Sequence, residues 1–173
     1  NMERGPDWGS IWNSLQIFGF NSGSTNYLAL LGTLAILAWV AVFLFGLKET
    51  PTLSEISFIV FASALILGKV YSPQYVLWLT ALAVIAIKSK PTLVMFWIWQ
   101  VAELIYHVAI WQHLATISEA QFGLSQNFYG AISLLRLVAS VAMIYSLANQ
   151  LKRERSTQGK PWDFLFESAS TYP

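Results

Sequence analysis

Three polar side chains near the middle of the chain lie between two strongly apolar runs. They are Lys69, Ser72 and Gln74, and Pro73 stands among them. Proline fixes its own backbone and disfavours helical geometry in the preceding residue, so a break or sharp turn is expected here. If the flanking runs enter a membrane, a lysine at such a break is a functional-site hypothesis by default. We predict an elbow that points these side chains into a shielded polar pocket; the alternative is a plain helix–helix turn.

A second set of polar residues lies within two later apolar runs. Glu103 and His107 are four residues apart in Thr92–Trp111, which puts them on one face of a helix. Arg136 interrupts Asn127–Asn149. Counted from the outer ends of these runs, Glu103 and Arg136 both lie about 12–14 Å deep. Because an unpaired charge is costly at that depth, we predict an ion pair between them, which could also serve only to fix helix packing.

The role of His107 stays open, because it lies only about 6 Å below the predicted surface. It could be a satisfied interior histidine, a hydrogen-bond donor to phosphate or a proton carrier. The two histidines and scattered carboxylates lack metal-ligand spacing, and the chain has no cysteine. It also lacks a glycine-rich phosphate loop, a nucleophile elbow and a nucleic-acid signature. We therefore expect no metal, no cofactor and no nucleic-acid partner.

The composition is that of an integral membrane protein or a piece of one. Of the 173 residues, 55% are hydrophobic and only 11% are charged, whereas soluble domains carry about 25% charge. Eight tryptophans and seven tyrosines suit a chain with several membrane–water crossings, where their amphipathic rings prefer to lie. Membrane lipids are therefore expected partners.

Apolar runs separated by turns predict an all-α fold, a polytopic transmembrane helix bundle over residues 25–149 with about five membrane segments. The second and third segments are short, about 22–24 Å as helices. Either their outer ends lie below the membrane surface, or they form a re-entrant hairpin. The five segments are Thr25–Leu47, Leu53–Gly68, Gln74–Ile87, Thr92–Trp111 and Asn127–Asn149.

The flanking regions are predicted to lie outside the bundle. Within residues 1–24, apolar side chains recur at spacings of three and four, as in an amphipathic helix lying at the outer interface. Such a helix could gate lipid access to the elbow or be a passive anchor, and an ordinary exposed helix packed on the protein is equally compatible. Residues 112–126 are expected to form a polar loop, and residues 150–173 a cytoplasmic basic tail. The apolar side chains of the N-terminal segment are Trp8, Ile11, Trp12, Leu15 and Phe18.

The distribution of basic residues predicts the orientation. Cytoplasmic loops carry an excess of lysine and arginine. With five crossings and a cytoplasmic C-terminus, the elbow and the N-terminal segment face the outside, and seven of the ten basic residues face the cytoplasm. Those seven are Lys48, Lys88, Lys90, Lys152, Arg153, Arg155 and Lys160.

The elbow resembles a motif of a known family. Residues 68–79 read Gly-Lys-Val-Tyr-Ser-Pro-Gln-Tyr-Val-Leu-Trp-Leu. This is similar to the lysine-containing elbow of the polyprenyl-phosphate-sugar-dependent glycosyltransferases of the GT-C superfamily, in particular the actinobacterial mannosyltransferase-like group, with the approximate pattern Lys-Val-Phe-Ser-Pro-Gln-Tyr-Leu-Leu-Trp-Leu. The segment Arg4–Trp12 also resembles the region upstream of that elbow.

The resemblance implies a function and a location. Members transfer a sugar, here expected to be mannose, from a polyprenyl-phosphate carrier to a lipid or glycan acceptor on the outer face of the membrane. The expected location is the bacterial cytoplasmic membrane. The family's catalytic acidic residue lies in an N-terminal half that these 173 residues do not include, and neither Glu3 nor Asp7 occupies that motif. We therefore expect a C-terminal part of a longer protein, with the N-terminal half as its partner.

Physical reasoning assigns roles around the elbow. Lys69 would be the counter-charge of the carrier phosphate, since an ammonium group is a good phosphate ligand. Ser72, Gln74 and His107 could donate hydrogen bonds to phosphate or sugar. The neighbouring aromatic side chains could line the path of the prenyl chain or stack on a sugar, although aromatic residues in membrane helices more often serve packing. These aromatic residues are Tyr71, Tyr75 and Trp78.

Two other functions are compatible with the sequence. A transporter or flippase-like protein would use a broken helix and buried charges to bind a polar or lipid-phosphate substrate, with Glu103 and His107 available for proton coupling. Transporters of this kind have paired broken helices in repeated halves, whereas a single break is visible here. A membrane scaffold without catalytic activity is the third possibility.

Overall fold

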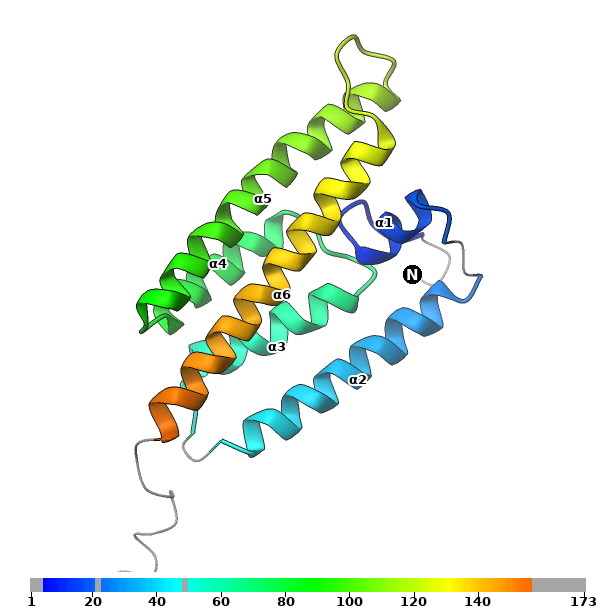
Figure 1. The fold of residues 1–173 in the computed structure, drawn as a ribbon. Helices are drawn as coiled ribbons and strands as arrows, with labels where there is room; N and C mark the ends of the chain where they lie inside the picture. The colour runs from blue at the N-terminus through cyan, green and yellow to red at the C-terminus, as the bar shows by residue number, and fades with distance from the viewer. Residues whose placement is uncertain (1–4, 21–22, 48–49, 157–173) are drawn as a thin grey trace, which may run out of the picture.

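The structure is a computed structural model that describes residues 5–20, 23–47 and 50–156, with side chains up to residue 153. Every regular element in these ranges is a helix (Figure 1), which confirms the predicted all-α class. The helices are α1 (Ile11–Ile17), α2 (Thr25–Phe45), α3 (Leu53–Leu67), α4 (Gln74–Ala86), α5 (Lys90–Ile117) and α6 (Gln126–Ser156).

Three of these helices, rather than the predicted five or so, are long and apolar enough to cross a membrane. They are α2, α5 and α6. Helices α3 and α4 have 15 and 13 residues, which is about 22 and 20 Å, against a hydrocarbon core of about 30 Å. Of the predicted five or so membrane segments, the described residues therefore contain three long enough to span; the other two are as short as predicted, because the elbow at Pro73 ends α3 and begins α4.

Helices α3 and α4 form an antiparallel hairpin joined by the elbow, Gly68–Pro73 (Figure 1). The open end of this hairpin, here called the base, also holds the end of α2 and the last turns of α6. Polar bonds tie the base together. Lys88 Nζ lies 2.7 Å from Glu55 Oε1, and Gln150 Oε1 accepts hydrogen bonds from the backbone N–H groups of Lys88 and Ser89 at 3.0 and 3.1 Å.

Glu55 has two roles at the base. Its side chain accepts a hydrogen bond from the backbone N–H of Thr52, and the Thr52 hydroxyl accepts one from the backbone N–H of Glu55, which closes a capping box at the start of α3. Burial alone would raise the pKa of Glu55, but the hydrogen bonds from Lys88 and Thr52 together lower that pKa below its ordinary value. The carboxylate therefore stays charged and keeps α3 attached to the turn before α5.

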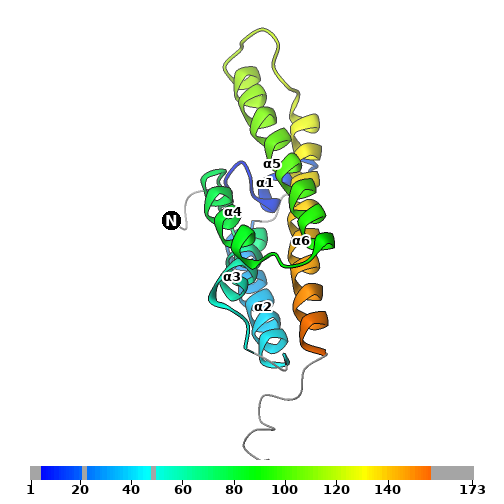
Figure 2. The ribbon, with the colours of Figure 1, turned by 90° about the vertical axis from the view of Figure 1, so that its left-hand side faces the viewer.

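Helices α5 and α6 form a long antiparallel hairpin that extends well beyond the elbow (Figures 1 and 2). Helix α5 continues to Ile117, so the first part of the predicted polar loop 112–126 is helical. Helix α6 continues past Asn149 to Ser156, so the predicted basic tail begins as part of this helix. Residues 157–173 of that tail lie outside the described residues.

The core lies where α3 packs against α2, α4 and α6. Phe58, Leu79, Trp99 and Met143 are at most 2% exposed and come from four different helices. Helix α2 packs mainly on α3 and exposes many large apolar side chains, Trp39 among them. An apolar helix with so little buried surface is suited to lipid rather than to water.

Helix α1 packs on α6 and on the elbow side of α3. Trp12 Nε1 donates a hydrogen bond of 2.8 Å to the carbonyl oxygen of Leu67, and the hydroxyls of Ser14 and Ser133 are 2.9 Å apart. Leu67 is the last residue of α3, whose final carbonyl groups lack helical partners. Helix α1 is therefore packed against the protein, although Phe18 is exposed, and its location at the outer membrane interface stays a prediction. The first four residues lie outside the described ranges.

Candidate functional site

The centre of the site is a fully buried arginine. Arg136, on α6, has 0% side-chain exposure and lies between two tyrosine rings, with its guanidinium carbon 3.7 Å from the ring centre of Tyr71 and 4.0 Å from that of Tyr106. Both faces of the guanidinium therefore contact aromatic π-systems, which attract a cation more strongly when water is excluded.

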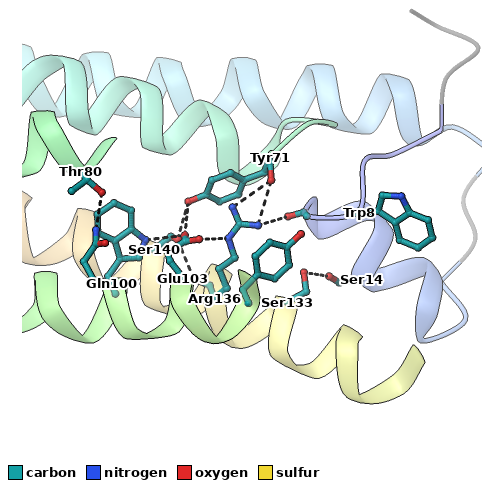
Figure 3. Close-up of polar contacts among 12 residues, drawn as sticks. Trp8, Ser14, Tyr71, Thr80, Gln100, Glu103, Ser133, Arg136 and Ser140 are labelled. Carbon is teal, nitrogen blue, oxygen red and sulfur yellow. Dashed lines mark hydrogen bonds and ion pairs between the residues drawn. The ribbon is translucent and has the colours of Figure 1, made fainter. Parts of the chain in front are cut away.

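The predicted ion pair is present (Figure 3). Arg136 Nε lies 2.8 Å from Glu103 Oε2, but its N–H is poorly aligned, so the contact is an ion pair without a good hydrogen bond. The other carboxylate oxygen of Glu103 accepts hydrogen bonds from the hydroxyl of Tyr71 at 3.2 Å and from Trp99 Nε1 at 3.1 Å. These donors satisfy Oε1 of a carboxylate that is only 2% exposed, whereas Oε2 is compensated by the charge of Arg136.

Arg136 also fixes the irregular backbone of the elbow (Figure 3). Its Nη1 and Nη2 atoms both donate to the carbonyl oxygen of Tyr71 at 3.3 Å, and Nη1 is 3.5 Å from the carbonyl oxygen of Gly9. The backbone N–H of Asp7 donates to the carbonyl oxygen of Lys69 at 2.9 Å. One side chain of α6 therefore holds both the elbow and the N-terminal segment, satisfying carbonyl groups that no helix can satisfy.

Gly9 is required by this packing. A Cβ at this position would be 2.6 Å from Arg136 Nη1 and 2.7 Å from the hydroxyl oxygen of Tyr106, and would overlap the backbone carbonyl of Tyr71. Any side chain here would therefore separate the N-terminal segment from the elbow.

The remaining predicted elbow residues are divided between the interior and the surface. Tyr71 is 1% exposed and its hydroxyl contacts Glu103 and Ser140, so we assign it to the buried network rather than to a lipid path. Lys69 is half-buried, and its ammonium group donates to the side-chain oxygen of Asn26, in the first turn of α2. Gln74 is exposed.

Ser72 and Tyr75 lie close to Lys69 in sequence but make different contacts. Ser72 is half-buried, and its carbonyl oxygen accepts a hydrogen bond from the backbone N–H of Tyr75 at 3.1 Å, which begins α4. Tyr75 is half-buried and edge-on to Trp78, with ring centres 5.9 Å apart. The structure thus brings Lys69 next to α2, whereas the aromatic pair continues along α4.

His107 does not join the network. It is half-buried and, within the described part of the chain, makes no hydrogen bond or ion pair. The other histidine, His113, is buried at 4% exposure and packs against two aromatic rings. It stacks on Tyr129 with ring centres 4.5 Å apart and contacts Trp8 edge-on with ring centres 5.5 Å apart. Sequence reasoning missed His113 because it fell in the predicted loop, although it lies two turns after Tyr106 on the buried face of α5.

This aromatic cluster continues the network toward the outer ends of α5 and α6. The hydroxyl oxygens of Tyr106 and Tyr129 are 3.2 Å apart, and the hydroxyl of Tyr129 donates to the carbonyl oxygen of Trp8. The N-terminal segment is therefore held along its length by polar contacts from α6. Among the described residues, no group of histidine, aspartate and glutamate has the arrangement of a metal site.

Comparisons with models of protein families, with curated proteins and with solved structures found no match. Over the part of the chain that the structure describes, the fold is all-helical, with three helices long and apolar enough to cross a membrane.

We predict that Glu103 and Arg136 are energetically coupled. Glu103→Gln or Arg136→Met alone leaves one buried charge unpaired, which costs about 3–5 kcal/mol. The double variant should lose less stability than either single variant, since it leaves no charge behind. Thermal unfolding of the purified protein in detergent measures the three losses, and additive losses would contradict the coupling.

A second prediction concerns the tight contact at Gly9. Gly9→Ala should lower the stability by about 1–3 kcal/mol or more, because overpacking forces the elbow and the N-terminal segment apart. Gly5→Ala is the matched control, since a Cβ there has no atom within 4 Å. Equal melting temperatures for the two alanine variants would show that the N-terminal segment does not pack against Arg136.

Proposed function

We propose that this chain is the C-terminal membrane portion of a glycosyltransferase that uses a polyprenyl-phosphate sugar. It would act on the outer face of a bacterial cytoplasmic membrane, with mannose as the expected sugar and a lipid or glycan as acceptor. The catalytic acidic residue would come from an N-terminal half of the same protein. The observation that carries the proposal is the position of Lys69, at a proline-broken elbow and against the first turn of α2.

The surroundings of Lys69 favour a phosphate ligand. Its ammonium group contacts Asn26, which lies at the amino end of a 21-residue helix with no acidic residue in its first turn. The amino end of a helix carries a partial positive charge of about half a unit, and an ammonium group beside it adds a full one. An anionic group bound next to Lys69 at this position would therefore be attracted both by the ammonium charge and by the positive end of the helix dipole.

The buried network behind Lys69 would prepare it for binding. The guanidinium of Arg136 holds the carbonyl oxygen of Tyr71, two residues along the elbow. A backbone fixed in this way does not have to be ordered when the ligand arrives, which lowers the entropic cost of binding. Ser72 and Gln74, which follow Tyr71 in the sequence, would supply further hydrogen bonds to phosphate or sugar.

Proton coupling through Glu103 and His107 would favour the transporter alternative. Glu103 is paired with Arg136 and accepts hydrogen bonds from Tyr71 and Trp99. Among the described residues, His107 makes no hydrogen bond or ion pair that would relay a proton to or from Glu103. The described contacts therefore give no support to proton coupling through this pair.

We predict that Lys69→Ala weakens binding of a polyprenyl-phosphate sugar about ten- to hundredfold, as expected for loss of a charged hydrogen-bond donor. Lys69→Arg should retain part of the affinity, because the charge remains. Binding to the protein in nanodiscs measures this effect without requiring turnover.

The matched control is Lys90→Ala, which removes one exposed lysine at the base of the molecule. Its donor affinity should equal that of the unchanged protein. Near-normal donor binding by Lys69→Ala, or an equal loss in both alanine variants, would contradict the proposed phosphate site.

A further inference from the structure

A groove of about 410 Å³ lies at the base, between the first turns of α5 and the last turns of α6. It is remote from Lys69, since α3 and α4 separate the base from the elbow. On α6, lining residues recur at spacings of three and four, so they share one face of the helix. The lining residues are Ser89, Pro91, Thr92, Met95, Ala142, Tyr145, Ser146, Asn149, Gln150 and Arg153.

The groove changes from polar to apolar along its length. Arg153 and Asn149 line it at the end of α6, and Ala142 lies two to three turns deeper, where Met95 of α5 lines the facing side. Beyond Ala142 the surface of α6 stays apolar, with Val138 65% exposed. An elongated ligand that fits this gradient has an anionic head and an apolar tail.

The walls of the groove are held by their own hydrogen bonds. The hydroxyl oxygens of Ser89 and Thr92 are 2.8 Å apart, and the Ser146 hydroxyl donates to Thr92 Oγ1 at 3.3 Å. In contrast, the side chains of Asn149 and Arg153 make no hydrogen bond or ion pair within the described residues. The groove is therefore largely pre-formed, and a ligand at its charged end would break no bond among the described side chains.

Charge at the base favours an anionic ligand. Lys90, Lys152 and Arg153 are all exposed at this end of the molecule. Among the side chains that the structure describes at this end, the carboxylate of Glu55 is buried and paired with Lys88. If the base faces the cytoplasm, as the basic residues predict, it meets the leaflet that carries anionic lipid.

We infer that the α5–α6 groove binds an anionic phospholipid, with its phosphate on Arg153 and Asn149 and one acyl chain along Met95 and Ala142. A guanidinium suits this role because its planar set of donors matches two phosphate oxygens. Free phosphate would contact the charged end alone and leave the apolar wall uncovered. This site is independent of the proposed glycosyltransferase function, because it lies at the opposite end of α3 and α4 from Lys69.

Native mass spectrometry of the full chain in detergent, titrated with phosphatidylglycerol or phosphatidylcholine, tests the inference. The unchanged protein should bind phosphatidylglycerol more tightly. Arg153→Gln should weaken phosphatidylglycerol binding about fivefold and leave phosphatidylcholine binding unchanged. Ala142→Phe should weaken the binding of both lipids, because it fills the apolar part of the groove without changing the charge.

Lys152→Gln is the matched control. This change removes one positive charge from the same turn of α6. The Nζ atom of Lys152 lies 5.6 Å from the ring centre of Phe43 on α2, and Lys152 does not line the groove. Phosphatidylglycerol binding should change less than twofold in this variant. Equal losses for Arg153→Gln and Lys152→Gln would overturn the site in favour of diffuse charge. Displacement of phosphatidylglycerol by millimolar inorganic phosphate, or unchanged lipid binding by Ala142→Phe, would overturn the acyl-chain assignment.

Discussion

The rest of the structure depends on one buried charge, the guanidinium of Arg136. A charge without water is tolerated only where it is paired and hydrogen-bonded. Here the partners are the carboxylate of Glu103, two backbone carbonyl oxygens and the faces of two tyrosine rings. They come from α5, the elbow and the N-terminal segment, so these elements can satisfy the charge only when they meet at one level of α6. Lysine could not replace arginine, since it lacks a planar group with donors at its edge and two open faces.

This constraint gives the elbow an inner and an outer side. The ring of Tyr71 faces the guanidinium of Arg136, and two residues earlier Lys69 contacts Asn26 at the start of α2. A rigid break between two short helices can hold a polar group at a defined position near lipid, which a flexible loop cannot. The proposed phosphate site uses this outer side, and the proposed phospholipid groove lies at the far end of the same helices. Each of these two proposed sites gives a function to polar side chains in a molecule whose surface is mostly apolar.

Part of this arrangement could be predicted from the sequence. The all-α class follows from the apolar runs, the break follows from Pro73, and the ion pair follows from the similar depths of Glu103 and Arg136. The bounds of the two short helices also followed from the sequence, but fewer helices than the predicted five or so are long enough to span a membrane, because α3 and α4 both stop at the elbow. The inward position of Tyr71 and the need for Gly9 could not be predicted, because both depend on contacts between segments more than 60 residues apart in sequence.

The most direct test of the central claim is NMR spectroscopy of the protein with ¹⁵N-labelled arginine side chains. The chain contains four arginines, so four Nε–H signals are expected. One of them, Arg136, should exchange slowly with water and be shifted upfield by the two tyrosine rings, and its signal should disappear in Arg136→Met. Rapid exchange and unshifted positions for all four signals would show that Arg136 is solvated and that the elbow is not built around it.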